Sequence, residues 1–156
     1  MRVHREATVG GKSRIAVFRR RAIVGQDEHR TSISPKNVYR ISTSFEAYSD
    51  YIRSARGEFS VAKQCYVATH CGWFGDRAAV FLASGRPVVM QDTGWSEHLP
   101  CGEGLFAVTG PDEAAEALEA VAGDYDRHSR RARELALEHF DAAKVFGRFL
   151  SELGVD

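Results

Sequence analysis

The sequence predicts an α/β domain in which helices pack on a parallel β-sheet. Three observations support this prediction. A helix-like apolar segment at 76–84 is followed by a tight turn and a short, continuously apolar strand at 87–90. A second strand-like run at 105–108 leads into a segment that begins like a helix. The chain then ends in two more segments whose apolar residues recur at helical spacing.

Composition indicates one ordinary globular domain. The 156 residues are 44% apolar and 27% charged, with room for a single sizeable core. The longest apolar run, Ala78 to Ala83, is far shorter than the roughly 20 residues of a membrane span. No apolar stretch of a secretory signal follows the basic start. We therefore expect no membrane span.

The three cysteines indicate a reducing compartment. Cys65, Cys71 and Cys101 are odd in number and irregularly spaced, so they do not resemble the paired framework of a small secreted domain. We expect a cytoplasmic protein.

Charge divides the chain into two segments of different character. Up to Arg40 there are ten Lys and Arg against three Asp and Glu, a formal charge of +7, and the remainder carries −7. We interpret residues 1–43 as a basic, poorly patterned segment and residues 44–156 as the folded domain. Within the basic segment, Ile15–Phe18 and Ala22–Val24 have the composition of short strands.

The rest of the basic segment gives little structural signal. Residues 25–35 are polar enough for a loop or a disordered stretch. The run Arg19-Arg20-Arg21 would suit nucleic acid, but it lacks an aromatic platform or a known motif. A solvated basic arm is the better interpretation, and we expect no nucleic-acid partner.

The first clear helix begins near Ser44, a suitable N-cap. Apolar residues follow it at helical spacing, and they are Phe45, Tyr48, Ile52 and Ala55. Gly57 lies just beyond, where helices tend to stop. Phe59–Val67 is a mixed apolar segment that fits either a strand or a short helix.

The central and C-terminal elements have sharper boundaries. Asp76–Ser84 predicts a buried helix that Gly85 and Pro87 end, and Pro87–Met90 predicts a strand buried on both faces. After the strand Leu105–Val108, Pro111 and the acids beside it mark another helix start, with a buried stripe of Ala114, Leu118 and Val121.

Two helices are predicted to end the chain. Gly123 breaks the preceding helix and Asp124 opens a longer one. A last helix begins at Asp141, and we expect it to pack on the sheet and bury Val145, Phe146, Phe149, Leu150 and Leu153.

The stretch His70-Cys71-Gly72-Trp73-Phe74-Gly75-Asp76 runs directly into the central helix. Gly72 and Gly75 let the backbone approach a ligand closely. The N-terminus of the helix favours an anion such as a diphosphate. His70, just before it, can donate a ring hydrogen bond to a phosphate oxygen.

A second polar group follows the strand at 87–90, in the run Gln91-Asp92-Thr93-Gly94-Trp95. Ligands of open α/β sheets bind beyond the carboxyl ends of the strands, so Asp92 and Thr93 are expected in the same crevice as His70. Their side chains suit the hydroxyls of a sugar or ribose. Asp92 also fits a purely local role, because Asp-Thr-Gly is good turn chemistry.

These motifs resemble a known family. His70-Cys71-Gly72-Trp73 resembles the motif that opens the donor-binding box of nucleotide-sugar-dependent glycosyltransferases with two Rossmann domains, the GT-B fold. The run 83–89 is similar to the family's pattern of a small residue, Gly, any residue, Pro and apolar residues. With Glu138-His139-Phe140-Asp141 near the last helix boundary, roughly residues 45–154 resemble the C-terminal part of bacterial family-1-like glycosyltransferases.

The resemblance implies a three-layer Rossmann-like domain that binds a nucleoside-diphosphate sugar as substrate, without a metal or other cofactor. His70 would contact the diphosphate, assisted by backbone N–H groups around Gly72 and Gly75. Trp73 would line the wall near the nucleotide. Asp92 and Thr93 would face the transferred sugar, and Gly94 beside them would belong to the same donor-binding site.

The sequence also departs from the family pattern. The plant-type box continues with Asn-Ser, where this chain has Phe74-Gly75, so one side-chain phosphate donor is missing. The same box has a ribose-binding Glu where this chain has Ala78, and Asp76 is the nearest acid that can replace it.

A complete GT-B enzyme has an N-terminal Rossmann domain that supplies the acceptor site and any general base, and none fits before Ser44. We therefore expect a truncated or divergent glycosyltransferase domain, without catalytic residues of its own and inactive alone. Its expected partners are a nucleotide sugar and either the missing domain or a second copy of the chain. Apolar surface left uncovered at Ala78–Leu82 would favour dimerisation. The alternatives are a non-catalytic nucleotide-binding or protein-interaction module and a pseudogene product without function.

Other chemistries fit the sequence less well. Five potential zinc ligands match no zinc spacing, and they are Cys65, His70, Cys71, His98 and Cys101. No third residue is evident to orient a Cys–His nucleophile. The run Gly10-Gly11-Lys12-Ser13 ends like a phosphate-binding loop, but Glu6 stands where that motif needs its first glycine.

Overall fold

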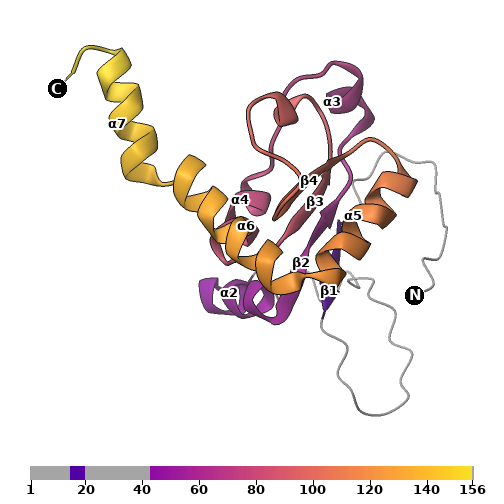
Figure 1. Cartoon of the computed structure of the whole chain (residues 1–156). Coiled ribbons are helices and arrows are strands. Elements are labelled where there is room, and N and C mark those ends of the chain that lie inside the picture. Colours follow the sequence, from indigo (N-terminus) through magenta and orange to yellow (C-terminus); the bar gives the residue numbers. More distant parts are fainter. Residues whose placement is uncertain (1–14, 20–42, 156) are drawn as a thin grey trace, which may run out of the picture.

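The computed structural model describes residues 15–19 and 43–155. They form a four-stranded sheet with helices on both faces (Figure 1). The strand order is β1-β2-β3-β4, with strands β1 (Ile15–Arg19), β2 (Ala55–Ser60), β3 (Val88–Gln91) and β4 (Leu105–Val108). Strands β2, β3 and β4 are parallel, which confirms the predicted α/β class and is compatible with a Rossmann-like fold.

Strand β1 adds an antiparallel edge to this sheet. It pairs with β2 from Ile15 opposite Ser60 to Arg19 opposite Ala55, with a register shift after Phe18. The predicted strand at 15–18 is therefore present, and it joins the sheet from within the basic segment. The predictions for Ala22–Val24 and for residues 25–35 fall outside the described residues.

One face of the sheet carries three helices, α2 (Phe45–Ser54), α4 (Asp76–Ala83) and α6 (Tyr125–His139). Phe81 and Leu82 of α4 are completely buried, in one cluster with Ala132 and Leu135 of α6. Helix α6 thus covers α4, so the apolar surface expected at 78–82 is not left open, apart from Val80.

The opposite face carries α5 (Pro111–Gly123), which gives the domain three layers. Ala114 and Ala117 pack against Val89 of β3 and Val108 of β4. Pro111 occupies the start of the helix and Gly123 its end, as predicted.

Local signals account for the helix starts. Ser44 accepts a hydrogen bond from the backbone N–H of Ala47 (3.2 Å), and Asp124 accepts one from Arg127 (3.3 Å). The segment 59–67 contains the end of β2 and most of a short helix, α3 (Gln64–Ala68). The strand and the short helix that its composition allowed are therefore both present.

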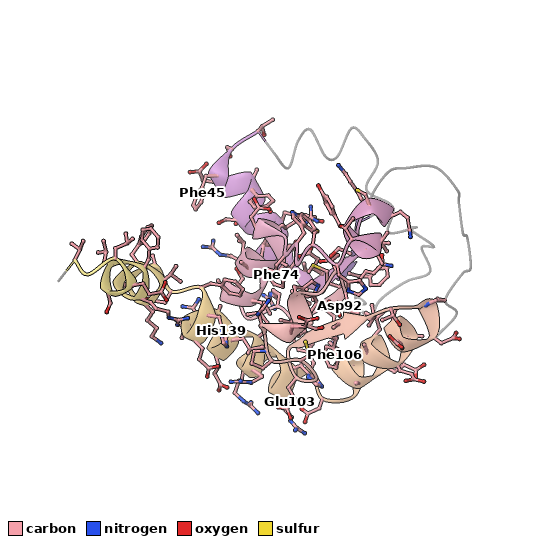
Figure 2. All side chains as sticks on the ribbon, turned by 90° about the horizontal axis from the view of Figure 1, so that it is seen from above. Phe45, Phe74, Asp92, Glu103, Phe106 and His139 are labelled. Atoms are coloured by element: carbon pink, nitrogen blue, oxygen red, sulfur yellow. The ribbon has the colours of Figure 1, made fainter. Side chains whose placement is uncertain are left out.

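The predicted packing of the last helix is wrong. Helix α7 (Ala142–Glu152) starts at the expected cap, Asp141, but it has no buried residue. In Figures 1 and 2 it extends away from the sheet. Helices α2, α4 and α6 already pack on one face of the sheet and α5 packs on the other. The helical spacing therefore predicted the helix correctly but not its packing.

Across the two described ranges, every helix is too short or too polar to cross a membrane.

Candidate functional site

Two loops meet beyond the carboxyl ends of the parallel strands. The first precedes α4 and contains residues 69–75, and the second follows β3 and contains residues 92–94. The backbone N–H of Gly72 donates to the carbonyl oxygen of Thr93 (2.8 Å), and the hydroxyl of Thr93 donates to the carbonyl oxygen of Trp73 (2.9 Å). The structure therefore brings together both halves of the sequence-predicted site.

Unusual backbone angles shape the junction of these loops. His70 has a φ of +46° and is the one non-glycine residue of the described chain with a positive φ. Gly72 and Gly94 have φ values of +71° and +98°. A Cβ atom at Gly94 would lie 3.2 Å from the carbonyl oxygen of His70, so the close approach of the two loops requires glycine there. The side chain of His70 is exposed to solvent.

The N-terminus of α4 carries a negative charge, and the ring of Trp73 lies against its buried N-cap, Gly75, where an added Cβ atom would be 3.2 Å from that ring. Gly75 provides no side-chain hydrogen bond to the helix. Asp76 is exposed in the first turn, and its carboxylate accepts from the backbone N–H of Arg77 (2.9 Å). That carboxylate partly offsets the positive end of the helix dipole and weakens its attraction for an anion.

Asp92 is engaged in local hydrogen bonds. It accepts from the backbone N–H of Gly94 (2.9 Å) and from the hydroxyl of Ser96 (2.6 Å). Burial raises the pKa of the Asp92 carboxyl, but the hydrogen bonds from Ser96, Gly94 and Thr93 outweigh it and the pKa is lowered. The carboxylate is therefore held ionised as the cap of the turn into the short 3-10 helix η1 (Trp95–Glu97).

The side chain of Thr93 is not available to bind a sugar hydroxyl. It is completely buried, and its hydroxyl is turned into the protein toward Trp73. Its role in the described structure is to hold the two loops together.

An aromatic surface that the sequence did not predict adjoins the first loop. The ring of Trp73 is 42% exposed and lies 5.3 Å from the ring of Tyr66 on α3. The ammonium group of Lys63 lies 5.7 Å from the centre of the Tyr66 ring. Tyr66 and Lys63 were missed because the sequence did not resolve the short helix α3 from the strand before it.

Phe74 anchors the same loop to the core. Its ring stacks 5.3 Å from that of Phe140 and meets that of Trp95 edge-on at 5.3 Å. Phe74 is partly buried and packs against the main apolar cluster of the core. The residue that replaces the polar one of the family pattern thus fixes the loop by packing instead of offering a hydrogen bond to phosphate.

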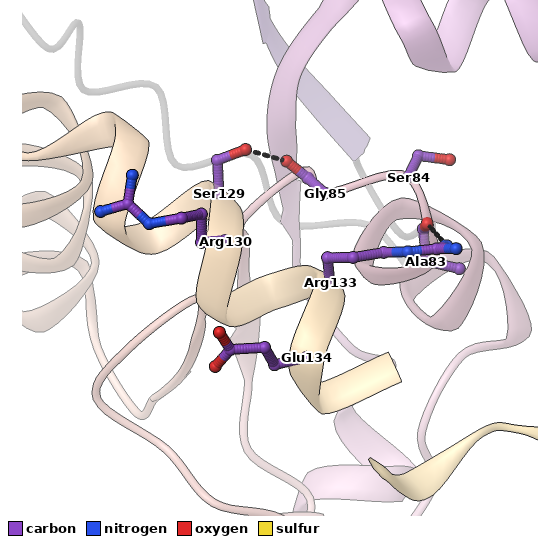
Figure 3. Close-up of a pocket in the computed structure, with 7 residues that line it drawn as sticks. All are labelled: Ala83, Ser84, Gly85, Ser129, Arg130, Arg133 and Glu134. Atoms are coloured by element: carbon purple, nitrogen blue, oxygen red, sulfur yellow. Dashed lines mark hydrogen bonds between the residues drawn. The ribbon is translucent and has the colours of Figure 1, made fainter. Parts of the chain in front are cut away.

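Neither of two surface hollows is lined by the predicted donor residues. A hollow of about 220 Å³ lies at the start of α5, lined by Phe59, Ser60, Val61, Gln91, Val108, Thr109, Gly110, Pro111 and Ala114. A more open one of about 510 Å³ lies between the end of α4 and helix α6 (Figure 3). There the Ser129 hydroxyl donates to the carbonyl oxygen of Gly85 (2.7 Å), and the Arg133 guanidinium donates to the carbonyl oxygen of Ala83. This second hollow precedes β3, at the opposite end of the sheet from the loop junction.

A buried ionisable pair lies under α4. Glu58 of β2 is 1% exposed, and its Oε1 lies 2.7 Å from Nε of the partly exposed Arg77. The second carboxylate oxygen of Glu58 is buried without a hydrogen-bond partner. Burial raises the pKa of the Glu58 carboxyl, against the opposing effect of Arg77.

The residues weighed as zinc ligands do not form a site. Cys65, Cys71 and Cys101 are exposed free thiols. Within residues 15–19 and 43–155, no three His, Cys, Asp or Glu side chains gather closely enough to hold a metal ion.

Comparison of the chain with protein-family models, with curated protein sequences and with solved structures found no match. The relationship to GT-B glycosyltransferases therefore stays a prediction from the motifs at 70–76 and 83–89.

Proposed function

We propose that this chain binds a nucleoside-diphosphate sugar where the loops at 69–75 and 92–94 meet, as the donor-binding part of a glycosyltransferase. The observation that carries the proposal is the pair of hydrogen bonds that Thr93 makes to Gly72 and Trp73. They hold the glycine-rich loop, with the exposed His70, beyond the carboxyl ends of parallel strands, where α/β domains bind ligands.

The proposed chemistry is electrostatic. The ring N–H of His70 and the backbone N–H groups at the start of α4 that Asp76 does not already engage would stabilise negative charge on the departing diphosphate. The partly exposed Trp73 and its neighbour Tyr66 offer an aromatic surface for the nucleotide. Asp92 and Thr93 would set the shape of the loop junction, because their polar groups are already engaged within the protein. The acceptor site and the general base would come from another domain.

Calorimetric titration of the full chain with UDP, TDP, GDP and ADP tests this proposal. We expect one of these diphosphates to bind selectively, and His70→Ala to weaken its binding about tenfold or more, since hydrogen bonds to charged groups contribute about 1.5–3 kcal/mol. His139→Ala, at the end of α6, is the matched control and should bind as the wild type does. A chain that is folded by circular dichroism but binds none of the four would contradict the proposal.

The exposed apolar residues of α7 favour a second candidate function, that of an interaction module. Genomic DNA directly upstream separates the two candidates. A Rossmann-domain sequence there, in phase or frameshifted, would support the glycosyltransferase, and its absence would support the module.

A further inference from the structure

Helix α7 presents an apolar stripe to solvent. Five side chains of one helix face are between 43% and 64% exposed, and they are Val145, Phe146, Phe149, Leu150 and Leu153. The helix meets the rest of the domain at its first turn, where the Lys144 ammonium donates to the carbonyl oxygen of Leu137 (2.8 Å). Beyond that turn it stands clear of the sheet and of the other helices (Figure 1).

A short helix with an exposed apolar face needs to pack against another protein surface to be stable. It has 11 residues, and isolated helices shorter than about 12–15 residues are marginal in water. Helical stability in proteins comes mostly from packing of the apolar face, and no residue of α7 is buried within the described domain. The stripe formed by these five residues therefore has no cover among the residues that the structure describes.

Two charged residues of α7, Arg148 and Glu152, indicate which kind of surface packs against the stripe. Arg148 and Glu152 are four residues apart, so they lie on the same flank of the helix. Both are exposed, and neither has an ion-pair partner among the residues that the structure describes. An antiparallel second copy of α7 brings the same flank of both helices together and places each Arg148 near the Glu152 of its mate. A parallel copy sets these flanks on opposite sides of the contact and forms neither pair.

We propose that α7 is the docking surface for a second copy of this chain, paired antiparallel about a two-fold axis near Leu150. This arrangement sets Val145 of one copy against Leu153 and Val155 of the other, and it forms two Arg148–Glu152 ion pairs. A two-fold axis makes the contact self-complementary and closed, so it yields a dimer rather than a filament. The zero formal charge of the chain adds no overall repulsion between copies. Because α7 is only about 16 Å long, the interface is small and the dimer depends on concentration.

Sedimentation velocity of the full chain over a range of concentrations tests the proposal. We expect the wild type to shift from monomer to dimer as concentration rises, and Phe149→Asp to weaken the dimer at least about tenfold because it buries a charge in the stripe. Ser151→Asp, on the opposite face of the helix, is the control and should dimerise as the wild type does. A wild type that stays monomeric at every concentration would overturn the proposal and assign the stripe to another domain or partner.

Charge reversal tests the antiparallel pairing without altering the stripe. Arg148→Glu and Glu152→Arg should each weaken self-association about fivefold or more, because like charges then meet twice across the axis. An equimolar mixture of the two variants should dimerise at least as well as the wild type. If the mixture associates no better than either variant alone, the antiparallel dimer is wrong.

Discussion

Gly104 lies at the start of β4, where helix α6 crosses close to the sheet. It has a φ of +74°, and a Cβ atom there would lie 2.5 Å from the backbone nitrogen of Ala132. Its own N–H donates to Nδ1 of the buried His128 (3.2 Å), which ties the same two elements together. Glycine at this position therefore sets the distance between the last strand and the helix that completes the core.

Gly104→Ala is expected to destabilise the protein by about 2–5 kcal/mol, from backbone strain together with the collision with α6. Urea unfolding followed by circular dichroism measures this loss. Gly102→Ala is the matched control, because Gly102 also has a positive φ (+106°) but nothing within 4 Å of its added Cβ. That variant should lose only about 1–2 kcal/mol. Equal losses in the two variants would show that the approach of α6 does not depend on this glycine.

Glu58 gives the fold a pH dependence of its own. Burial raises its pKa above the ordinary value of 4.5, so the folded protein still holds the proton at pH values where the unfolded chain has released it. The contribution of Glu58 to stability is therefore complete below pH 4.5 and is lost as the pH rises through the folded-state pKa.

Unfolding free energies measured from about pH 4 to about pH 8 test this prediction. Glu58→Gln should remove part of the decline in stability with rising pH, because the amide cannot ionise. Glu116→Gln, at an exposed position of α5, should leave the decline unchanged. The explanation fails if Glu58→Gln and the wild type lose stability in parallel.

Individual elements were predictable where their signals are local. Gly85 with Pro87, Pro111, and the caps Ser44 and Asp124 each act within one turn of chain, and the boundaries that they predict agree with the structure to within a residue or two. The antiparallel pairing of β1 with β2 was not predicted, because it joins residues about 40 apart and no local signal specifies it. The spacing of apolar residues in α7 shows which face of the helix is apolar, but it does not specify what packs against that face.

The same distinction applies to the candidate site. The meeting of the loops at 69–75 and 92–94 was predictable, because carboxyl ends of parallel strands share one edge of a sheet. The bond from the Thr93 hydroxyl to the Trp73 carbonyl was not, because it spans 20 residues and ends on a backbone atom that any residue type provides. The location of the junction was therefore predictable, but the hydrogen bonds that Asp92 and Thr93 already make within the protein were not.

The whole domain is asymmetric about its sheet. Among the residues that the structure describes, helices α2, α4 and α6 form the layer on one face, and α5 packs on the other. The loop junction lies at the carboxyl edge of the parallel strands, while α7 leaves from the end of α6 and extends outward (Figure 1). Ligand binding at the junction and association through α7 thus involve separate surfaces, and variants that alter one should leave the other intact.

The two tryptophans of the chain lie in or next to the loop junction, so their fluorescence reports on it. Trp73 is 42% exposed on the first loop, whereas Trp95, just after the second loop, is 1% exposed. Acrylamide should quench one fluorescence component, with the longer emission wavelength, and leave the other nearly untouched. A nucleotide bound over the first loop should protect that quenchable component selectively, and Trp73→Phe should abolish it. Occupancy of the proposed site can therefore be followed in the native protein without an attached dye.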